Sequence, residues 1–318
     1  MNSLAEMVDV LRQYDNYLIV AHENPDPDSI GSMLAMYRFL QLIGKNARMI
    51  CADPIPPYPW PNIEHIQASA DTAFENVIIL DCEPTRTGKL LPLIKQAKLS
   101  FNIDHHEGNG AYCDYNYIDT NQAATCMIIY QLLQVAGVTV DTQLAIALYA
   151  GIIGDTGGFR HANTTEDVFR VAADLVAHGA NPNLTAQVIF ESKPIEFMRF
   201  LGYALGKLQT GLNQRLVWLA LTYEDFNRYG IDPRQSDQII DYTRMVEGCE
   251  IAILFREVSP NMIRIGFRSR RMPIHQLAVQ FGGGGHLLAA GASVAGPLDE
   301  TVQKVIAAAA QLLEGDSQ

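Results

Sequence analysis

Aspartate and histidine residues recur along this sequence in short runs that suit the binding of metal ions. The candidates are His22, Asp26, Asp28, Asp81, Asp104, His105, His106 and Asp155. Any one of them alone would most simply be a turn or cap residue, because Asp is common in both. Together they form a set of oxygen and nitrogen donors without thiolates, which suits Mg, Mn, Fe or Zn. Their number exceeds the needs of one tetrahedral ion, and a site for two divalent cations uses them all.

The segments before these residues predict that the side chains meet. Tyr17–Ala21, Asn76–Leu80 and Leu99–Ile103 are short apolar runs typical of buried strands, and each ends directly before a candidate residue. A helical pattern over Leu144–Gly154 ends in the same way before Asp155. Short strands separated by helices indicate a parallel α/β sheet with helices on both faces, and ligands bind at the carboxyl ends of such strands. Carboxylates gathered there repel one another, and a bound cation relieves the repulsion.

The length of the chain and a change of pattern indicate two domains. A chain of 318 residues is too long for one core. We expect an α/β metal-binding domain over 1–185, a helical linker over 186–209 and a smaller α+β domain over 210–318. In the last of these, Leu216–Leu221 and Met262–Phe267 are typical of strands.

The composition restricts the class of protein and its partners. The formal net charge is −12, whereas proteins that hold long nucleic acids usually have a basic surface, so a small anionic substrate fits better. No apolar run is long enough for a membrane span, and the N-terminus lacks the pattern of a signal peptide. The five cysteines are scattered and form no C-x-x-C pair, which is typical of a reducing compartment. We therefore expect a cytoplasmic protein without a membrane partner.

A glycine run and a basic segment mark the C-terminal region. Gly282–Gly285 directly precede His286, and four arginines without an acid lie within 264–271. A glycine run alone can be a flexible turn, and a basic strand face is often only solvated. The run can also let backbone N–H groups approach a phosphate or a base. Alternation puts Arg264 and Arg268 on one face of a strand, and Arg suits phosphate recognition, so we favour anion binding here.

The order of these motifs resembles that of the DHH family of phosphoesterases. The family is named for the triplet found here as Asp104-His105-His106. The other matching motifs are His22-x-x-Pro25-Asp26-x-Asp28-x-x-Gly31-Ser32, Asp81 followed by Arg86 and Gly88, Asp155 in GDTGGF, and Gly282–His286 followed by Ala289-Ala290-Gly291. The last motif resembles the signature of the DHH-associated substrate-binding domain. The resemblance covers nearly the whole chain. Pro27 stands where the family often has Gly, a departure that should leave metal binding intact.

The resemblance implies a role for each of these residues. One cation would bind His22, Asp26 and Asp81. The other would bind Asp28, Asp81, His105 and Asp155, so that Asp81 bridges the two. His106 would face the scissile phosphate and assist the leaving group, while Asp104 would orient the histidines. The residues implied in substrate binding are Arg268, Ser269, Gly283, Gly284, Gly285, His286 and Arg86, the last with the alternative role of fixing the loop after Asp81.

The same resemblance implies hydrolysis of short oligoribonucleotides (nanoRNA, pApA-type dinucleotides), with the 3′-phosphate of pAp as a further target. Two divalent cations, Mn²⁺ first and Mg²⁺ or Fe²⁺ as alternatives, would supply the activated water. Three other functions stay open: a cyclic-dinucleotide phosphodiesterase, a manganese inorganic pyrophosphatase and a non-catalytic nucleotide-binding protein. The glycine run counts against the pyrophosphatase, and the complete ligand set counts against a non-catalytic protein. A homodimer is also left open.

Overall fold

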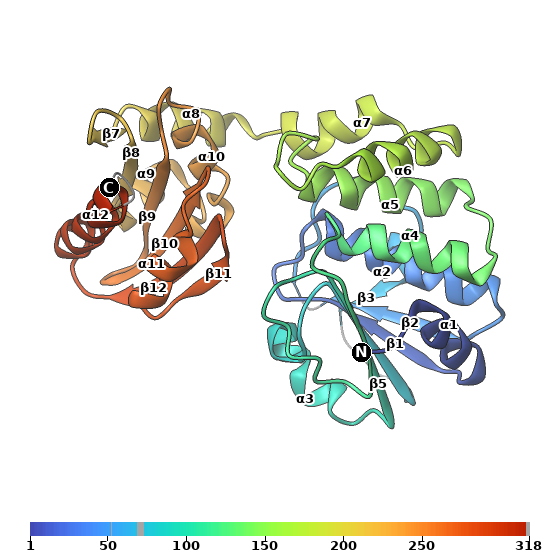
Figure 1. Cartoon of the computed structure of the whole chain (residues 1–318). Helices are drawn as coiled ribbons and strands as arrows, with labels where there is room; N and C mark the ends of the chain where they lie inside the picture. The colour runs from blue at the N-terminus through green and yellow to red at the C-terminus, as the bar shows by residue number, and fades with distance from the viewer. Residues whose placement is uncertain (52, 69–72, 316–318) are drawn as a thin grey trace. The chain divides into compact units, whose positions relative to one another are not determined.

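The computed structural model describes residues 1–51, 53–68 and 73–315 of the chain. The chain forms two compact units, Met1–Ser192 and Lys193–Gln318 (Figure 1). Each unit has a hydrophobic core of its own. Among the described residues, no helix is both long enough and apolar enough to cross a membrane.

A parallel sheet forms the centre of the first unit. The described residues of this unit place six strands in the order β3-β2-β1-β4-β5-β6, and every neighbouring pair is parallel. The strands are β1 (Tyr17–Val20), β2 (Ala47–Ile50), β3 (Ile66–Gln67), β4 (Asn76–Leu80), β5 (Leu99–Asp104) and β6 (Tyr115–Ile118). The strands predicted from the sequence are β1, β4 and β5, which are largely buried. The outer strands are shorter or less apolar, which explains why the pattern misses them.

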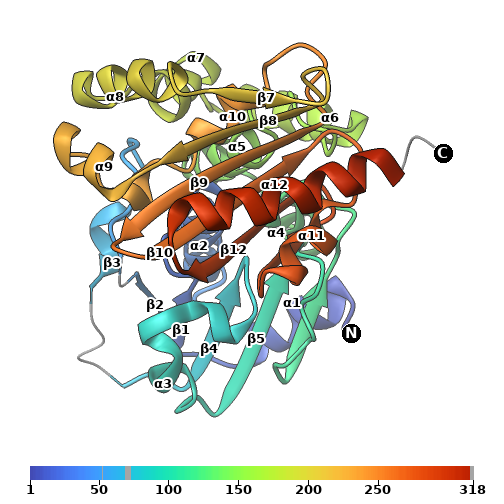
Figure 2. The ribbon, with the colours of Figure 1, turned by 90° about the vertical axis from the view of Figure 1, so that its left-hand side faces the viewer.

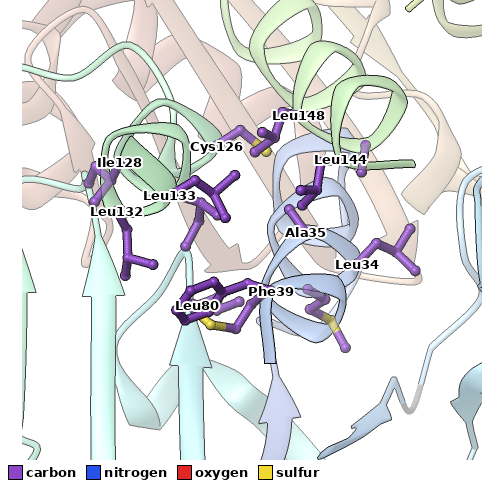
Figure 3. Close-up of a cluster of buried hydrophobic side chains, with 14 of the residues drawn as sticks. Leu34, Ala35, Phe39, Leu80, Cys126, Ile128, Leu132, Leu133, Leu144 and Leu148 are labelled. Atoms are coloured by element: carbon purple, nitrogen blue, oxygen red, sulfur yellow. The ribbon is translucent and has the colours of Figure 1, made fainter. Parts of the chain in front are cut away.

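Long helices lie on one side of this sheet, and the short elements η2 and α3 lie on the other (Figure 1). The long helices are α1 (Leu4–Gln13), α2 (Pro27–Leu42), α4 (Thr125–Ala136), α5 (Thr142–Asp155) and α6 (Glu166–Ala177). The short elements are η1 (Ile63–His65), η2 (Pro84–Leu90), α3 (Leu91–Ile94), α7 (Pro182–Ala186) and η3 (Gln187–Glu191). Figure 3 shows how Phe39 of α2, Leu133 of α4 and Leu148 of α5 meet in the core. On the opposite side, Leu90 and Ile94 pack against β1 and β4. The predicted α/β fold with a parallel sheet is confirmed.

A mixed sheet forms the centre of the second unit. Its described residues place six strands in the order β11-β12-β10-β9-β8-β7, and the pairs are antiparallel except for β8 and β9. The strands are β7 (Gln209–Gly211), β8 (Leu216–Leu221), β9 (Ile251–Ser259), β10 (Met262–Ser269), β11 (Gly284–His286) and β12 (Ala289–Ala295). The helices are α8 (Ile195–Leu205), α9 (Tyr223–Tyr229), η4 (Pro233–Gln235), α10 (Ile239–Thr243), α11 (Ile274–Gln280) and α12 (Leu298–Gly315). The expected smaller α+β fold is therefore present.

Different helices pack against the two faces of this second sheet. Phe255, Ile265 and Phe267 face the core formed with α11 and α12, and Figure 2 shows α12 crossing in front of β9 and β10. The opposite face of β8 and β9 packs against Phe197 and Phe200 of α8 and against α9 and α10. Helix α8 falls in the segment 186–209 expected as a linker, and its apolar face belongs to the core of the second unit.

Candidate metal centre

Three side chains meet where β1 and β4 end. His22 follows β1, Asp26 is the N-cap of α2, and Asp81 follows β4. Nε2 of His22 lies 3.6 Å from Oδ2 of Asp26 and 3.5 Å from Oδ2 of Asp81. Ligand atoms of the three residues lie within 4.8 Å of one another. Pro27 is the first residue of α2, a position that proline suits, so this departure from the family pattern is accommodated by the helix start.

A second trio consists of Asp28 in the first turn of α2, His105 after β5 and Asp155 at the end of α5. Nε2 of His105 lies 3.1 Å from Oδ2 of Asp155 and 4.0 Å from Oδ2 of Asp28. Asp28 is fully buried and accepts backbone N–H groups of Thr125 at 2.6 Å and Cys126 at 3.0 Å. These N–H groups belong to the first turn of α4, where they have no partner within the helix, so α4 holds the carboxylate in place.

Asp81, a member of the first trio, lies between His22 and His105. Its Oδ2 is 3.5 Å from Nε2 of His22, and its Oδ1 is 3.5 Å from Nε2 of His105. The same Oδ1 accepts a hydrogen bond of 2.9 Å from the hydroxyl of Thr125. The backbone of Asp81 has φ 63°, in the left-handed region that Asp tolerates better than most residues. The chain thus turns sharply after β4, and Asp81 directs one carboxylate oxygen toward His22 and the other toward His105.

Backbone carbonyl groups orient both histidines. Nδ1 of His22 lies 2.8 Å from the carbonyl oxygen of Glu23, and Nδ1 of His105 lies 3.2 Å from that of Gln122. Each Nδ1 therefore donates, and Nε2 is directed at the carboxylates. Nε2 of His105 is buried and has no hydrogen-bond partner among the described residues, although Oδ2 of Asp155 is 3.1 Å away. A nitrogen lone pair beside carboxylates needs a positive charge between them, so these residues fit a divalent cation.

The pKa values report the same need for positive charge. Burial, together with the charges of Asp28 and Asp26, raises the pKa of Asp81 to about 8. Burial and Asp28 raise the pKa of Asp155 to about 6. Burial opposes a charged imidazole, yet the neighbouring carboxylates outweigh it and raise the pKa values of His22 and His105 to about 11. Without cations, the cluster would therefore retain protons in their place.

Asp104 orients His106. Oδ1 of Asp104 lies 2.7 Å from Nδ1 of His106 and also accepts the backbone N–H of His106 at 3.1 Å. Oδ2 of Asp104 accepts from Nδ2 of Asn109 at 2.7 Å, and Asn109 in turn donates to Asn102 at 2.7 Å. The second ring nitrogen of His106, Nε2, is thereby turned away from Asp104. His106 also lies close enough to Asp81 and His105 to share a metal ion with them.

Several residues that hold these ligands carry no motif in the sequence. Thr125 contacts both Asp81 and Asp28. Nδ2 of Asn163 donates to the carbonyl oxygen of Asp155 at 3.2 Å, and Nδ1 of His161 lies 3.2 Å from the same oxygen. A polar residue within a buried apolar run is the signal that could have found Thr125, which is fully buried.

Arg86 lies on η2, in the loop after Asp81. Its side chain is exposed, and its backbone carbonyl accepts the N–H of Glu23 at 2.9 Å. Gly88 has φ 57°, and a Cβ there would lie 2.6 Å from Oε2 of Glu23. The positive φ therefore favours glycine at this position, whereas the carboxylate of Glu23 could move aside. The loop contact expected for Arg86 is made by its backbone, which leaves the guanidinium available to a substrate.

The last two glycines of the run, together with His286, form the edge strand β11 of the second sheet. β11 pairs with β12, and a Cβ at Gly283 would lie 2.1 Å from the carbonyl oxygen of Gly291. A Cβ at Gly285 would lie 2.6 Å from the carbonyl oxygen of Ala289, whereas one at Gly284 meets nothing within 4 Å. Close packing of the backbone thus accounts for Gly283 and Gly285, whereas Gly284 faces open space. The side chain of His286 lies outside the part of the structure that is described.

Arg268 and Ser269 end β10 and face opposite sides of the sheet. Ser269 is 2% exposed, and its hydroxyl oxygen accepts the N–H groups of Arg271 at 3.2 Å and Met272 at 2.7 Å. Ser269 therefore supports the turn after β10. Arg268 is partly exposed, and its Nη1 donates to the carbonyl oxygen of Phe267 at 3.0 Å, which leaves further donors of the guanidinium for a ligand.

The motif order and this arrangement match a known family. The family model described as DHH family, N-terminal domain, matches residues 16–152, and the DHHA1 domain matches residues 213–315. The chain belongs to the DHH family of phosphoesterases. In this DHH protein, the residues of both trios lie within the first matched range, except for Asp155, which lies just after its end.

Relatives of this DHH protein span nearly its whole length. A protein from Thermus thermophilus named bifunctional oligoribonuclease and PAP phosphatase NrnA is 29% identical over 306 residues, which cover 95% of this chain and 92% of the relative. A protein of the same name from Bacillus subtilis is 25% identical over 297 residues, which cover 91% of this chain and 92% of the relative. The crystal structure of an exopolyphosphatase-related protein from Bacteroides fragilis has a TM-score of 0.88 at 22% identity, over 98% of this chain and 96% of the other. The DHH protein therefore shares its fold with that structure.

Proposed function

We propose that this protein hydrolyses phosphoester bonds in short oligoribonucleotides, such as pApA, and removes the 3′-phosphate from pAp. The observation that carries the proposal is the position of Asp81, whose two carboxylate oxygens lie 3.5 Å from Nε2 of His22 and 3.5 Å from Nε2 of His105. A carboxylate shared between two sets of ligands suits two-metal hydrolysis at phosphate. The names of the relatives from Thermus thermophilus and Bacillus subtilis support the substrate class.

The residues present would divide between two cations. His22, Asp26 and Asp81 would hold one, and Asp28, Asp81, His105 and Asp155 would hold the other. When bound, the cations would supply an activated water and offset negative charge on the phosphate. Donors of this kind without a thiolate suit Mn²⁺, which we propose as the native ion, with Mg²⁺ or Fe²⁺ as alternatives.

Other side chains of the first unit would act on the substrate directly. His106, held by Asp104 through Nδ1, would direct Nε2 at a phosphate oxygen and assist the leaving group. The exposed guanidinium of Arg86, on the loop after Asp81, would bind a second phosphate oxygen. Asp104 would act through His106 rather than on the substrate.

The second unit would bind the far end of the substrate. Arg268 would contact a phosphate, and the open position at Gly284 would let backbone groups approach it. A net charge of −12 disfavours long polyanions and leaves small ones to be held by a few specific groups. All five cysteines are free, which suits action in the cytoplasm. A homodimer is compatible with these features, and sedimentation would decide it.

The test is a panel of substrates given to the purified protein with Mn²⁺: pApA, cyclic di-AMP, pAp, a 24-mer RNA and pyrophosphate. We expect turnover of pApA and pAp, with the 24-mer slowest among the nucleotides. Asp81→Asn should abolish this turnover. Asp9→Asn, which changes an exposed carboxylate of α1, is the matched control and should retain it.

Each rival function has its own outcome in this panel. Turnover of pyrophosphate alone would mean a pyrophosphatase, and turnover of cyclic di-AMP alone would mean a cyclic-dinucleotide phosphodiesterase. Tight binding of pApA by the metal-loaded protein without any product would mean a non-catalytic nucleotide-binding protein.

A further inference from the structure

We propose that the second unit has an additional phosphate-binding position at Arg264, which holds an extra nucleotide of substrates longer than a dinucleotide. The inference rests on the proposed function, because it concerns the length of the oligonucleotide that the protein binds. It adds a position to those expected at Arg268 and the glycine run.

A hollow opens beside Arg264. Its volume is about 540 Å³, and it lies between α9 with the loop after it and the adjoining ends of β9 and β10. Tyr223, Phe226 and Val258 contribute apolar lining. The Tyr223 side chain is 36% exposed, so part of it is accessible from solvent. An aromatic ring near an arginine suits a nucleotide, because a base stacks on the ring while the arginine binds the phosphate.

Arg264 and Arg256 form an unusual pair of like charges. They lie directly opposite each other on β10 and β9, and residues in this relation face the same side of a sheet. Arg256 is 4% exposed, forms an ion pair with Asp237, and donates to the carbonyl oxygen of Pro233 at 3.0 Å. Arg264 is exposed and makes no hydrogen bond or ion pair with another described residue. Like charges placed opposite each other destabilise a sheet, and an anion bound at Arg264 would relieve the repulsion.

The carboxylates near the hollow are already engaged. Oδ2 of Asp232 lies 2.6 Å from Nη2 of Arg234. That hydrogen bond is the main reason why the pKa of Asp232 is lowered, and the charge of Arg264 contributes less. Asp237 is paired with Arg256. The positive charge of Arg264 is therefore not neutralised by an ion pair, and its guanidinium can bind a phosphate.

On this face of β10, the side chain of Ile240 in α10 lies over the position between Arg268 and Arg264. The residue between them on the same face is Gly266, and its partner on β12 is Gly291. Ser293, the exposed partner of Arg264 on β12, adds a hydroxyl donor beside the guanidinium. Four residues of a strand span about 13 Å. At about 3.4 Å per stacked nucleotide, this separation corresponds to about four nucleotides, so a dinucleotide bound at Arg268 does not reach Arg264, and a longer chain would pass beside α10 to reach it.

The experiment compares binding of two ligands by the full-length protein with Mn²⁺: 5′-phosphorylated di- and pentaadenylate with non-hydrolysable phosphorothioate linkages. Arg264→Gln should weaken pentaadenylate binding about tenfold and leave dinucleotide binding unchanged within roughly twofold. The slope of log K against log salt for pentaadenylate should fall by about 0.7, the value for one lost phosphate contact on a single strand. Arg264→Lys should retain most of that slope. Arg199→Gln, at an exposed arginine of α8, is the control and should change neither ligand.

Equal weakening of both ligands by Arg264→Gln, or no weakening of either, would overturn the proposal. Hydrolysis of unmodified pApA by the wild-type protein, measured in parallel, reports on the proposed function separately. If the wild-type protein hydrolyses no oligonucleotide while Arg264→Gln still weakens pentaadenylate binding, the proposed activity is refuted and the binding position is kept. A wild-type protein that binds neither ligand would refute both.

Discussion

The hydroxyl of Thr125 donates a hydrogen bond of 2.9 Å to Oδ1 of Asp81, a residue of the first trio. The backbone N–H of Thr125 donates at 2.6 Å to Asp28, a residue of the second trio. Both donors belong to the first residue of α4, so one rigid helical turn fixes the distance between a carboxylate of each trio.

Thr125→Val should weaken metal binding, because valine keeps the shape of the side chain and removes the donor to Asp81. Groups that orient metal ligands typically contribute about 10- to 100-fold to metal affinity, and we expect a loss in that range. Calorimetric titration of Mn²⁺ into chelator-treated protein measures it. Thr125→Ser keeps the hydroxyl and is the control. Wild-type affinity in Thr125→Val would show that the hydrogen bond does not position Asp81.

Asp81→Asn should make the metal-free protein more stable and should also remove metal. Burial and the charges of Asp28 and Asp26 raise the pKa of Asp81 to about 8, so its charged form is unfavourable in the folded protein. We expect the melting temperature in EDTA to rise by roughly 2–4 °C for each kcal/mol gained. The number of Mn²⁺ ions bound, measured by elemental analysis, should drop below two. A lower melting temperature in EDTA would contradict this account of the charge cluster.

The metal-free protein should lose stability as the pH rises from about 4 to about 8. Burial and neighbouring carboxylates raise the pKa values of Asp81 to about 8 and of Asp155 to about 6, so both keep protons in the folded state that unfolded carboxyls lose near pH 4. Because the folded state binds more protons in this window, the free energy of unfolding falls with rising pH. His22 and His105, with pKa values raised to about 11, act in the same direction above about pH 6.5.

Urea titrations in EDTA at several pH values measure this trend. Saturating Mn²⁺ should weaken or reverse it, because metal ligands bind as deprotonated groups and cations replace the protons. Stability in EDTA that increases steadily from pH 4 to pH 8 is the result that does not fit.

Gly283→Ala should destabilise the second unit, and Gly284→Ala should not. A Cβ at Gly283 would lie 2.1 Å from the carbonyl oxygen of Gly291, a backbone atom that moves only if β12 moves. Overpacking of this kind costs about 1–3 kcal/mol. A Cβ at Gly284 meets nothing within 4 Å, so its variant should retain the wild-type unfolding midpoint and show a higher KM for pApA. Equal midpoints for the two variants would mean that the close packing at Gly283 is easily relieved.

His106→Ala should lower kcat for pApA by about 10²- to 10⁴-fold, the usual contribution of a general acid or base, while two cations stay bound. Metal analysis accompanies the kinetics. Full activity with full metal content would exclude both proposed roles of His106. Loss of one cation would make His106 a metal ligand instead, which its distance of 3.7 Å from Oδ1 of Asp81 permits.

The fold class and the convergence of the ligands were predictable from the sequence for one physical reason. Parallel strands buried on both faces are continuous apolar runs, so β1, β4 and β5 stand out, and the residues directly after these runs must lie at the same edge of the sheet. His22, Asp81 and Asp104 occupy those positions or end the strand itself.

The contacts that support the site were not predictable, because they join distant segments, even though the position of Thr125 within an apolar run marks it as unusual. Thr125 reaches Asp28 across 97 positions of the sequence, and no local pattern marks that pairing. Helix α8 is a similar case. Its sequence is largely apolar and so predicts a buried face, but only the core of the second unit reveals what Phe197 and Phe200 contact.

Asp28 is hydrogen-bonded to the first turn of α4, and this contact couples ion binding to the stability of the whole first unit. The same helix packs Leu132 and Leu133 into the core, so whatever loosens α4 also loosens a carboxylate of the cation site. By mass action, cations at 100 times their dissociation constant would stabilise the folded state by about 2.7 kcal/mol. The concentration of divalent cations in a cell would then influence how long each molecule resists proteolysis as well as its rate of turnover. Leu133→Ala, a substitution in the core that changes no metal ligand, would therefore raise the concentration of metal that the protein needs for half-maximal activity.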